Sequence, residues 1–145
     1  MEISASLSQL FVRLALGVGF LSPGLDRFGV WGPHGTSGVT WGDWAHFSVY
    51  ARKLMFFLPD GLAEGLAIIA SVAELLFGVL LVMGLFTRYA AWGSGLLALS
   101  FAVCMWLAFG IRVPLDYSVF VVSAAGFLLA TVPFYAWSID CLLYT

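Results

Sequence analysis

The sequence predicts an all-α membrane protein: an antiparallel bundle of four transmembrane helices, with a long first loop that carries a short interfacial helix. Hydrophobic residues make up 62% of the 145 residues and charged residues only 10%, whereas soluble domains average about 45–50% apolar and about 25% charged residues. Four apolar segments approach the length of about 20 residues that a helix needs to cross a bilayer. Short connections join the last three segments, as in antiparallel bundles. We therefore expect a single domain, embedded in a lipid bilayer.

The first apolar segment, residues 8–28, is expected to be a span with one close-packing face. Arg13, Gly17 and Gly24 recur on that face at helical spacing, and small residues allow another helix to approach closely. Arg13 lies about 8 Å from the start of the helix at 1.5 Å per residue. Two interpretations remain for this arginine: it anchors the helix at the headgroups, or it pairs with Glu74 of the second span.

The first loop, residues 29–60, is rich in glycine and in aromatic residues that favour the membrane–water interface. Its second half is predicted to form a short helix in the headgroup plane, with Trp44, Phe47, Ala51 and Leu54 toward the lipid. Long loops in compact proteins are commonly binding surfaces. The loop is therefore interpreted either as an interfacial anchor or as a surface for a protein partner. The residues predicted to contact such a partner are Trp31, Trp41, Trp44 and Phe47.

The second span, residues 62–86, carries one acid, Glu74, near its middle. A carboxyl group within the hydrocarbon is costly, so it should have a partner or a task. Ser71 and Gly78 share its helical face, which places the acid beside a close-packing position. Glu74 is either a structural acid, neutral or paired, or a group that exchanges protons with a ligand. Asp60 is predicted to cap the start of this helix.

The third and fourth spans are predicted at residues 89–110 and 116–137, where the sequence is again apolar. Four antiparallel helices place both termini on the same side of the membrane as the turn at Thr87 and Arg88. The opposite side carries more basic residues, and the positive-inside bias then places the long loop in the cytoplasm.

Composition and motifs exclude several classes of function. The formal net charge of −2 is spread thinly, so no nucleic-acid partner is expected. The sequence contains no Cys-x-x-Cys-His, no dinucleotide-binding glycine fingerprint and no P-loop lysine. His34 and His46 both fall in the first loop, so we expect neither a haem held between helices nor a metal site. Cys104 and Cys141 fall at different depths of the bundle and are not expected to form a disulfide.

Two stretches resemble the first two helices of the DoxX-like membrane proteins: RLALGVGFLSPGLDRF at residues 13–28 and AELLFGVLLVMGLFTRYAA at residues 73–91. This family includes the small subunit of thiosulfate:quinone oxidoreductase and relatives of the methylamine-utilisation membrane protein. The third and fourth predicted spans match the family only as apolar helices. The matching positions are Arg13, Gly17, Gly24, Glu74, Gly78, Gly84, Leu85, Thr87 and Arg88.

The resemblance implies a four-helix protein of a bacterial or archaeal cytoplasmic membrane. Several members are subunits or partners of membrane redox systems, which implies a quinone-linked role with electrons supplied by another membrane subunit. On this hypothesis Glu74 exchanges protons with a quinone, while Arg13 or Tyr89 polarises a quinone carbonyl oxygen. Two alternatives remain: a non-catalytic accessory subunit that packs against a larger membrane complex, and a small-molecule carrier.

Overall fold

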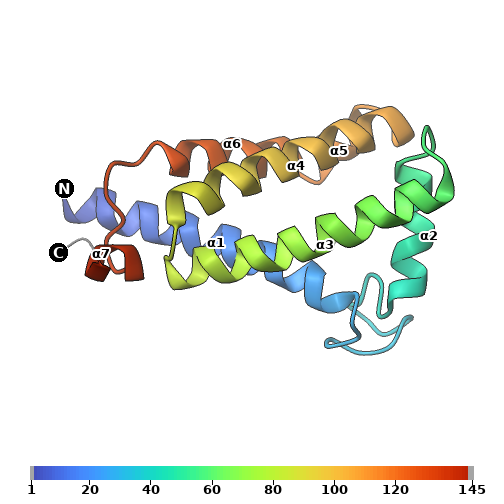
Figure 1. Ribbon diagram of the computed structural model, residues 1–145, viewed down its shortest axis with the longest axis horizontal. Helices are drawn as coiled ribbons and strands as arrows, with labels where there is room; N and C mark the ends of the chain where they lie inside the picture. Colours follow the sequence, from blue (N-terminus) through green and yellow to red (C-terminus); the bar gives the residue numbers. More distant parts are fainter. Residues whose placement is uncertain (1, 144–145) are drawn as a thin grey trace.

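A computed structural model describes residues 2–143, and these residues form helices and no strand (Figure 1). Three of the helices are long and apolar enough to cross a membrane: α1, α3 and α4. The helices, in chain order, are α1 (Ile3–Asp26), α2 (Trp44–Leu54), α3 (Asp60–Met83), α4 (Thr87–Phe109), α5 (Arg112–Asp116), α6 (Val119–Ala130) and α7 (Ile139–Leu143).

The fourth predicted span is not one continuous helix. Within the segment predicted at residues 116–137, the longest helical part is Val119–Ala130, and these 12 residues extend about 18 Å. A break separates α5 from α6 at Ser118, whose φ of 56° lies in the left-handed region. The helix also stops before Pro133, since proline donates no backbone hydrogen bond and disfavours helical geometry in the residue before it. The structure therefore supports an all-helical membrane fold with three long spans.

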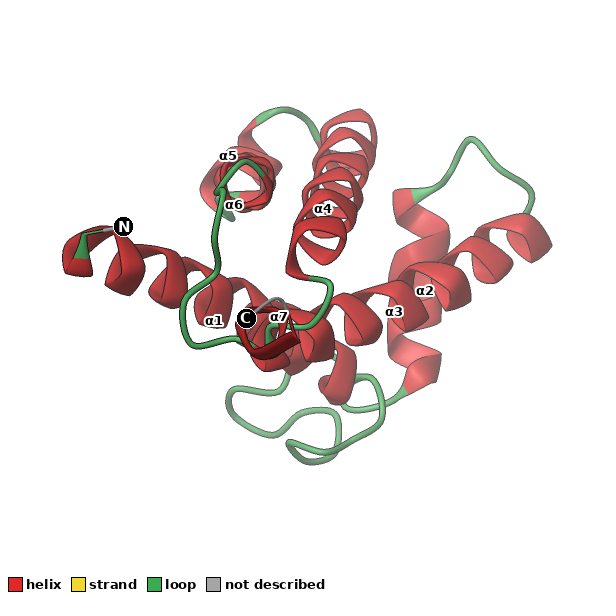
Figure 2. Ribbon diagram, turned by 60° about the vertical axis from the view of Figure 1, so that its left-hand side comes forward, coloured by secondary structure: helices red, strands yellow, loops and turns green. Residues whose placement is uncertain are grey.

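The helices pack as two antiparallel pairs, with α1 against α3 and α4 against α6 (Figure 1). Figure 2 looks nearly along α4 and α6 and shows these two as neighbours over α1 and α3. Glycine allows the close approach within the first pair: a Cβ on Gly78 would lie 3.0 Å from the carbonyl oxygen of Gly17. A central apolar cluster joins the two pairs, and it contains Leu16, Phe20, Leu81, Ala91 and Leu129.

Helix α2 covers the part of α3 that extends past the end of α1. Phe47 and Ala51 pack with Ala67 of α3, and Leu54 is also buried. The prediction that this face of α2 turns toward lipid was therefore wrong, because Phe47 and Ala51 pack against α3 instead. The predicted cap is also corrected, since Pro59 is the N-cap of α3 and its first helical residue is Asp60.

Different segments of the chain lie at the two ends of the helices. The described residues nearest both termini share one end with the turn between α3 and α4, whereas α2 and the first loop lie at the other end (Figure 1). Polar side chains gather between helices at both ends, and each end is described below.

Candidate functional site: an ion pair beneath the first loop

Glu74 of α3 forms a buried ion pair with Arg27, the C-cap residue of α1. Glu74 Oε2 lies 2.6 Å from Arg27 Nη1, and the two residues are only 4% and 5% exposed. The prediction that Arg13 pairs with this acid was wrong. Since α1 and α3 cross where Gly17 meets Gly78, the antiparallel arrangement brings the C-terminal end of α1, and with it Arg27, to the level of Glu74.

Two further side chains hold the Arg27 guanidinium in place. Its Nη1 donates a hydrogen bond to Ser71 Oγ at 2.6 Å, and that hydroxyl donates to the carbonyl oxygen of Ala67 at 2.8 Å. The guanidinium carbon lies 3.8 Å from the centre of the Phe47 ring, within the range of a cation–π interaction. The cation is therefore fixed by α3 on one side and by α2 on another.

Asp26 fastens the first loop to this cluster. Its Oδ2 accepts hydrogen bonds from the backbone N–H groups of Thr40 at 3.0 Å and Trp41 at 2.8 Å. Asp26 is buried beside Arg27, so two carboxyl groups and one guanidinium share a small volume. Thr40 and Trp41 of the first loop are thereby tied to the C-terminal end of α1.

Some polar atoms of the cluster retain hydrogen-bonding capacity. Asp26 Oδ1 and Arg27 Nε are buried and have no hydrogen-bond partner among the described residues. Glu74 Oε2 faces Arg27 at ion-pair distance but lacks hydrogen-bond geometry. Native proteins pair nearly all such buried groups, with protein atoms or with water. The cluster therefore suits a water molecule or a polar ligand atom.

Arg13 lies at the opposite end of the molecule and is also buried, with 2% of its surface exposed. Its Nη2 donates to the carbonyl oxygen of Trp137 at 2.7 Å and its Nη1 to that of Ala136 at 3.4 Å. Gln9 donates to the same Ala136 oxygen at 3.0 Å. Arg13 is therefore neither a headgroup anchor nor the partner of Glu74: it holds the segment that follows α6.

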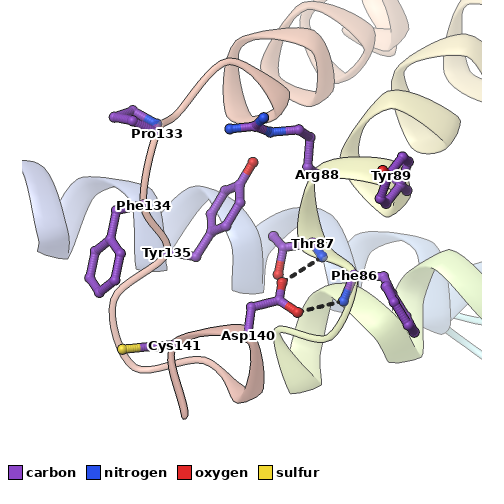
Figure 3. Close-up of a pocket in the computed structure, with 9 residues that line it drawn as sticks. All are labelled: Phe86, Thr87, Arg88, Tyr89, Pro133, Phe134, Tyr135, Asp140 and Cys141. Atoms are coloured by element: carbon purple, nitrogen blue, oxygen red, sulfur yellow. Dashed lines mark hydrogen bonds between the residues drawn. The ribbon is translucent and has the colours of Figure 1, made fainter. Parts of the chain in front are cut away.

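Tyr89 lies near Arg13's end of the molecule, not near Glu74. It is 75% exposed and lines a cavity of about 350 Å³ beside the turn between α3 and α4 (Figure 3). The ten residues from Glu74 to Gly84 span about 15 Å of helix, so one quinone ring cannot contact both Glu74 and Tyr89. The structure does not assemble Glu74, Arg13 and Tyr89 into a single pocket.

The aromatic residues predicted to meet a partner pack largely on one another. Trp41 and Trp44 each contact the ring of Phe47, with ring centres 5.5 and 5.3 Å apart. Phe47 itself is buried and offers no surface to a partner. Trp31 is 53% exposed, and its indole N–H donates to the carbonyl oxygen of Ser22 at 3.0 Å.

The main residue that sequence reasoning missed is Arg27, the partner of Glu74. A signal for its role was present. Arg27 shares a helical face with Gly17 and Gly24, just as Glu74 shares one with Gly78. When the glycine-bearing faces of α1 and α3 pack against each other in antiparallel orientation, Arg27 lies opposite Glu74.

Three long apolar helices with an ion pair enclosed between two of them define a polytopic helical membrane protein. The DoxX family model matches residues 8–110, a range that includes both members of the ion pair and most of the chain. The chain belongs to the DoxX family. No curated protein and no solved structure was found to match it.

Proposed function

We propose that this DoxX-family protein is a subunit of a quinone-linked redox assembly in the cytoplasmic membrane of a prokaryote, and that Glu74 exchanges protons there. One observation carries the proposal: an ion pair with both members about 95% buried lies along an apolar helix. Such pairs rarely add stability over apolar residues of similar size, because both ions lose their hydration. Ionisable residues inside membrane helices commonly mark proton or substrate pathways.

The residues of the cluster fit this role. A bound quinone supplies the redox chemistry, taking up electrons and an equal number of protons as it becomes quinol. Glu74 in its protonated form holds a proton within the span, and Arg27 stabilises the carboxylate that remains when the proton leaves. Asp26 lies next to Arg27 and accepts hydrogen bonds from the first loop, so it holds that loop against the cluster. The electrons come from a partner subunit.

The test is the Glu74→Gln variant in the complex purified with its partners. Glutamine keeps the shape of the side chain but carries no exchangeable carboxyl proton, so quinone reduction should fall about a hundredfold, the scale of general acid–base catalysis. Glu64→Gln is the matched control, since Glu64 also lies on α3 but accepts a hydrogen bond from Ser48 at 3.3 Å. Turnover unchanged by Glu74→Gln would contradict the proposal.

Because Glu74→Gln leaves Arg27 without its counter-charge, loss of folding must be separated from loss of chemistry. The double variant Arg27→Gln/Glu74→Gln removes both charges and should restore stability without restoring activity. Recovery of activity in the double variant would show that Glu74 is structural.

A second candidate function is that of a non-catalytic accessory subunit. Gly61 and Gly65 lie one turn apart on α3, and a Cβ at either position would meet no atom within 4 Å. Such small residues on a membrane helix allow a partner helix to approach closely. Gly65→Leu should then reduce co-purification of partner subunits in mild detergent. A protein that is always recovered alone and monomeric would argue against this candidate.

A further inference from the structure

A second polar site lies in the cavity of Figure 3, at the other end of the molecule from Glu74. Phe86 and the first turn of α4 form one wall, and the segment between α6 and α7 forms the other together with the start of α7. We propose that this cavity binds the phosphate group of an anionic phospholipid, with Arg88 and Thr87 as the contacting residues.

Arg88 is the main cation of the cavity. It is exposed, its Nη2 lies 3.5 Å from the carbonyl oxygen of Val132, and its guanidinium also interacts with the Tyr135 hydroxyl. Figure 3 shows the Arg88 and Tyr135 side chains pointing toward one another across the cavity. A guanidinium carries five N–H donors in a fork that matches phosphate geometry. Arg88 therefore has donors to spare for a ligand.

Thr87 gives an independent indication of a ligand. This residue lines the cavity and is completely buried, yet its Oγ1 has no hydrogen-bond partner among the described residues. A buried hydroxyl without a partner is costly, and such groups are rare in native proteins. An oxygen of a bound phosphate would accept its hydrogen bond.

The charges around the cavity favour an anion. Asp140 is the acid of the lining, but its two carboxylate oxygens each accept a backbone hydrogen bond at 2.8 Å, from Phe86 and Thr87 (Figure 3). Arg13 interacts electrostatically with the same carboxylate. Arg13, which does not line the cavity, thus offsets the charge of Asp140 from inside the protein and leaves Arg88 as the cation that faces the cavity.

The surface next to the cavity favours a lipid over a free anion. Tyr89, Trp92, Leu96 and Leu99 are exposed apolar residues on one face of α4, at helical spacing. This stripe begins at the cavity and runs along a helix long enough to span the membrane. A phosphate held by Arg88 would thus place acyl chains along α4. This inference is independent of Glu74 and of the proposed redox role.

The test is native mass spectrometry of the full chain, delipidated in detergent and titrated with phosphatidylglycerol, phosphatidylcholine or inorganic phosphate. We expect phosphatidylglycerol to bind more tightly than phosphatidylcholine, whose choline cation opposes Arg88. Arg88→Gln should weaken phosphatidylglycerol binding about tenfold or more, and Thr87→Val should weaken it several-fold, the scale of a lost charged or neutral hydrogen bond. Arg112→Gln, at the exposed start of α5, is the matched control and should bind like the wild type.

Each other outcome decides against the proposal. Equal binding of the two lipids, or equal binding by wild type, Arg88→Gln and Thr87→Val, would overturn it. If inorganic phosphate binds but phosphatidylglycerol does not, the phosphate group does not come from a lipid and the proposal is overturned. If Arg88→Gln does not fold, Arg88→Lys takes its place, since lysine keeps the positive charge but lacks the forked N–H donors of the guanidinium. The proposal would also be overturned if Arg88→Lys and Thr87→Val both bind phosphatidylglycerol with the affinity of the wild type.

Discussion

At the scale of single residues, Arg27 shows how one side chain can serve several contacts inside a membrane. Its Nη1 meets both the Glu74 carboxylate and the Ser71 hydroxyl at 2.6 Å, while its flat face lies on Phe47. A lysine has neither the flat face nor the fork of donors. Arginine at this position therefore holds α1, α2 and α3 together at one point.

Gly84 is the residue whose replacement should harm the fold most directly. It ends α3 with a φ of 68°, a left-handed conformation that L side chains rarely adopt. A Cβ there would lie 2.5 Å from Ser138 Cβ and 2.7 Å from Arg13 Nη1. Gly84→Ala should destabilise the protein by about 1–3 kcal/mol, measured by thermal unfolding in detergent.

Gly19 is the matched control for that experiment. It lies within α1, and a Cβ at this position would meet no atom within 4 Å. Alanine is a better helix former than glycine, so Gly19→Ala should leave the midpoint of unfolding unchanged or slightly raised. An equal fall in the midpoint of unfolding in the two variants would show that the left-handed conformation of Gly84 does not cause the destabilisation.

At the scale of elements, the start of α2 depends on a titratable cap. Asp43 is the N-cap of α2, and its Oδ1 accepts the backbone N–H of His46 at 2.8 Å. This hydrogen bond, together with that from the His46 imidazole, lowers the pKa of Asp43 below its ordinary value. A lowered pKa means that the ionised cap stabilises the folded state.

The stabilisation of α2 by the ionised Asp43 cap should therefore be lost at low pH. Its contribution is complete above the unfolded pKa of aspartate, about 3.9, and is lost as the pH falls through the lower pKa of the folded state. Below about pH 4 we expect faster amide hydrogen exchange in the first turn of α2. Asp43→Asn caps a helix without titrating, so its exchange should lack this pH-dependent step; an identical step in both proteins would contradict the assignment.

Some elements were predictable from the sequence and others were not. Apolar length located the three long spans and the turn that joins α3 to α4. The orientation of α2 was not predictable, because its apolar face suits lipid and protein equally well. Its orientation is a tertiary feature: Phe47 and Ala51 pack inward against Ala67 of α3.

The same limit applies to the candidate site. The sequence identified Glu74 because one acid in an apolar helix is conspicuous. It did not identify its partner, because Arg13 and Arg27 both lie on the close-packing face of α1. The point at which α1 crosses α3 determines which of the two arginines lies opposite Glu74. That crossing point is where Gly17 approaches Gly78.

At the scale of the whole molecule, the fourth segment determines on which side of the membrane the two ends of the chain lie. Residues 112–130 cover about 28 Å at the helical rise, so α5 and α6 together return the chain to the end where it began (Figure 1). We therefore expect Ser4 and Leu142, both exposed, to lie on one side of the membrane. Ser37, in the first loop, should lie on the other side.

Cysteine labelling in oriented vesicles checks this topology. Ser4→Cys, Leu142→Cys and Ser37→Cys are made one at a time with Cys104 and Cys141 replaced by alanine, after folding of that background is verified. A membrane-impermeant maleimide should label the first two from one side and the third only from the other. Labelling of Ser4→Cys and Leu142→Cys from opposite sides would mean that the fourth segment does not cross.

The burial of Arg13 has a consequence for biosynthesis. Its guanidinium donates to carbonyl oxygens of residues 136 and 137, which leave the ribosome more than a hundred residues later. Until then the cation must remain hydrated at the bilayer surface or be held by the insertion machinery, because lone charges are costly in lipid. The contacts of the Arg13 guanidinium are thus complete only after residues 136 and 137 have been synthesised, and a truncation before residue 136 removes both of these acceptors.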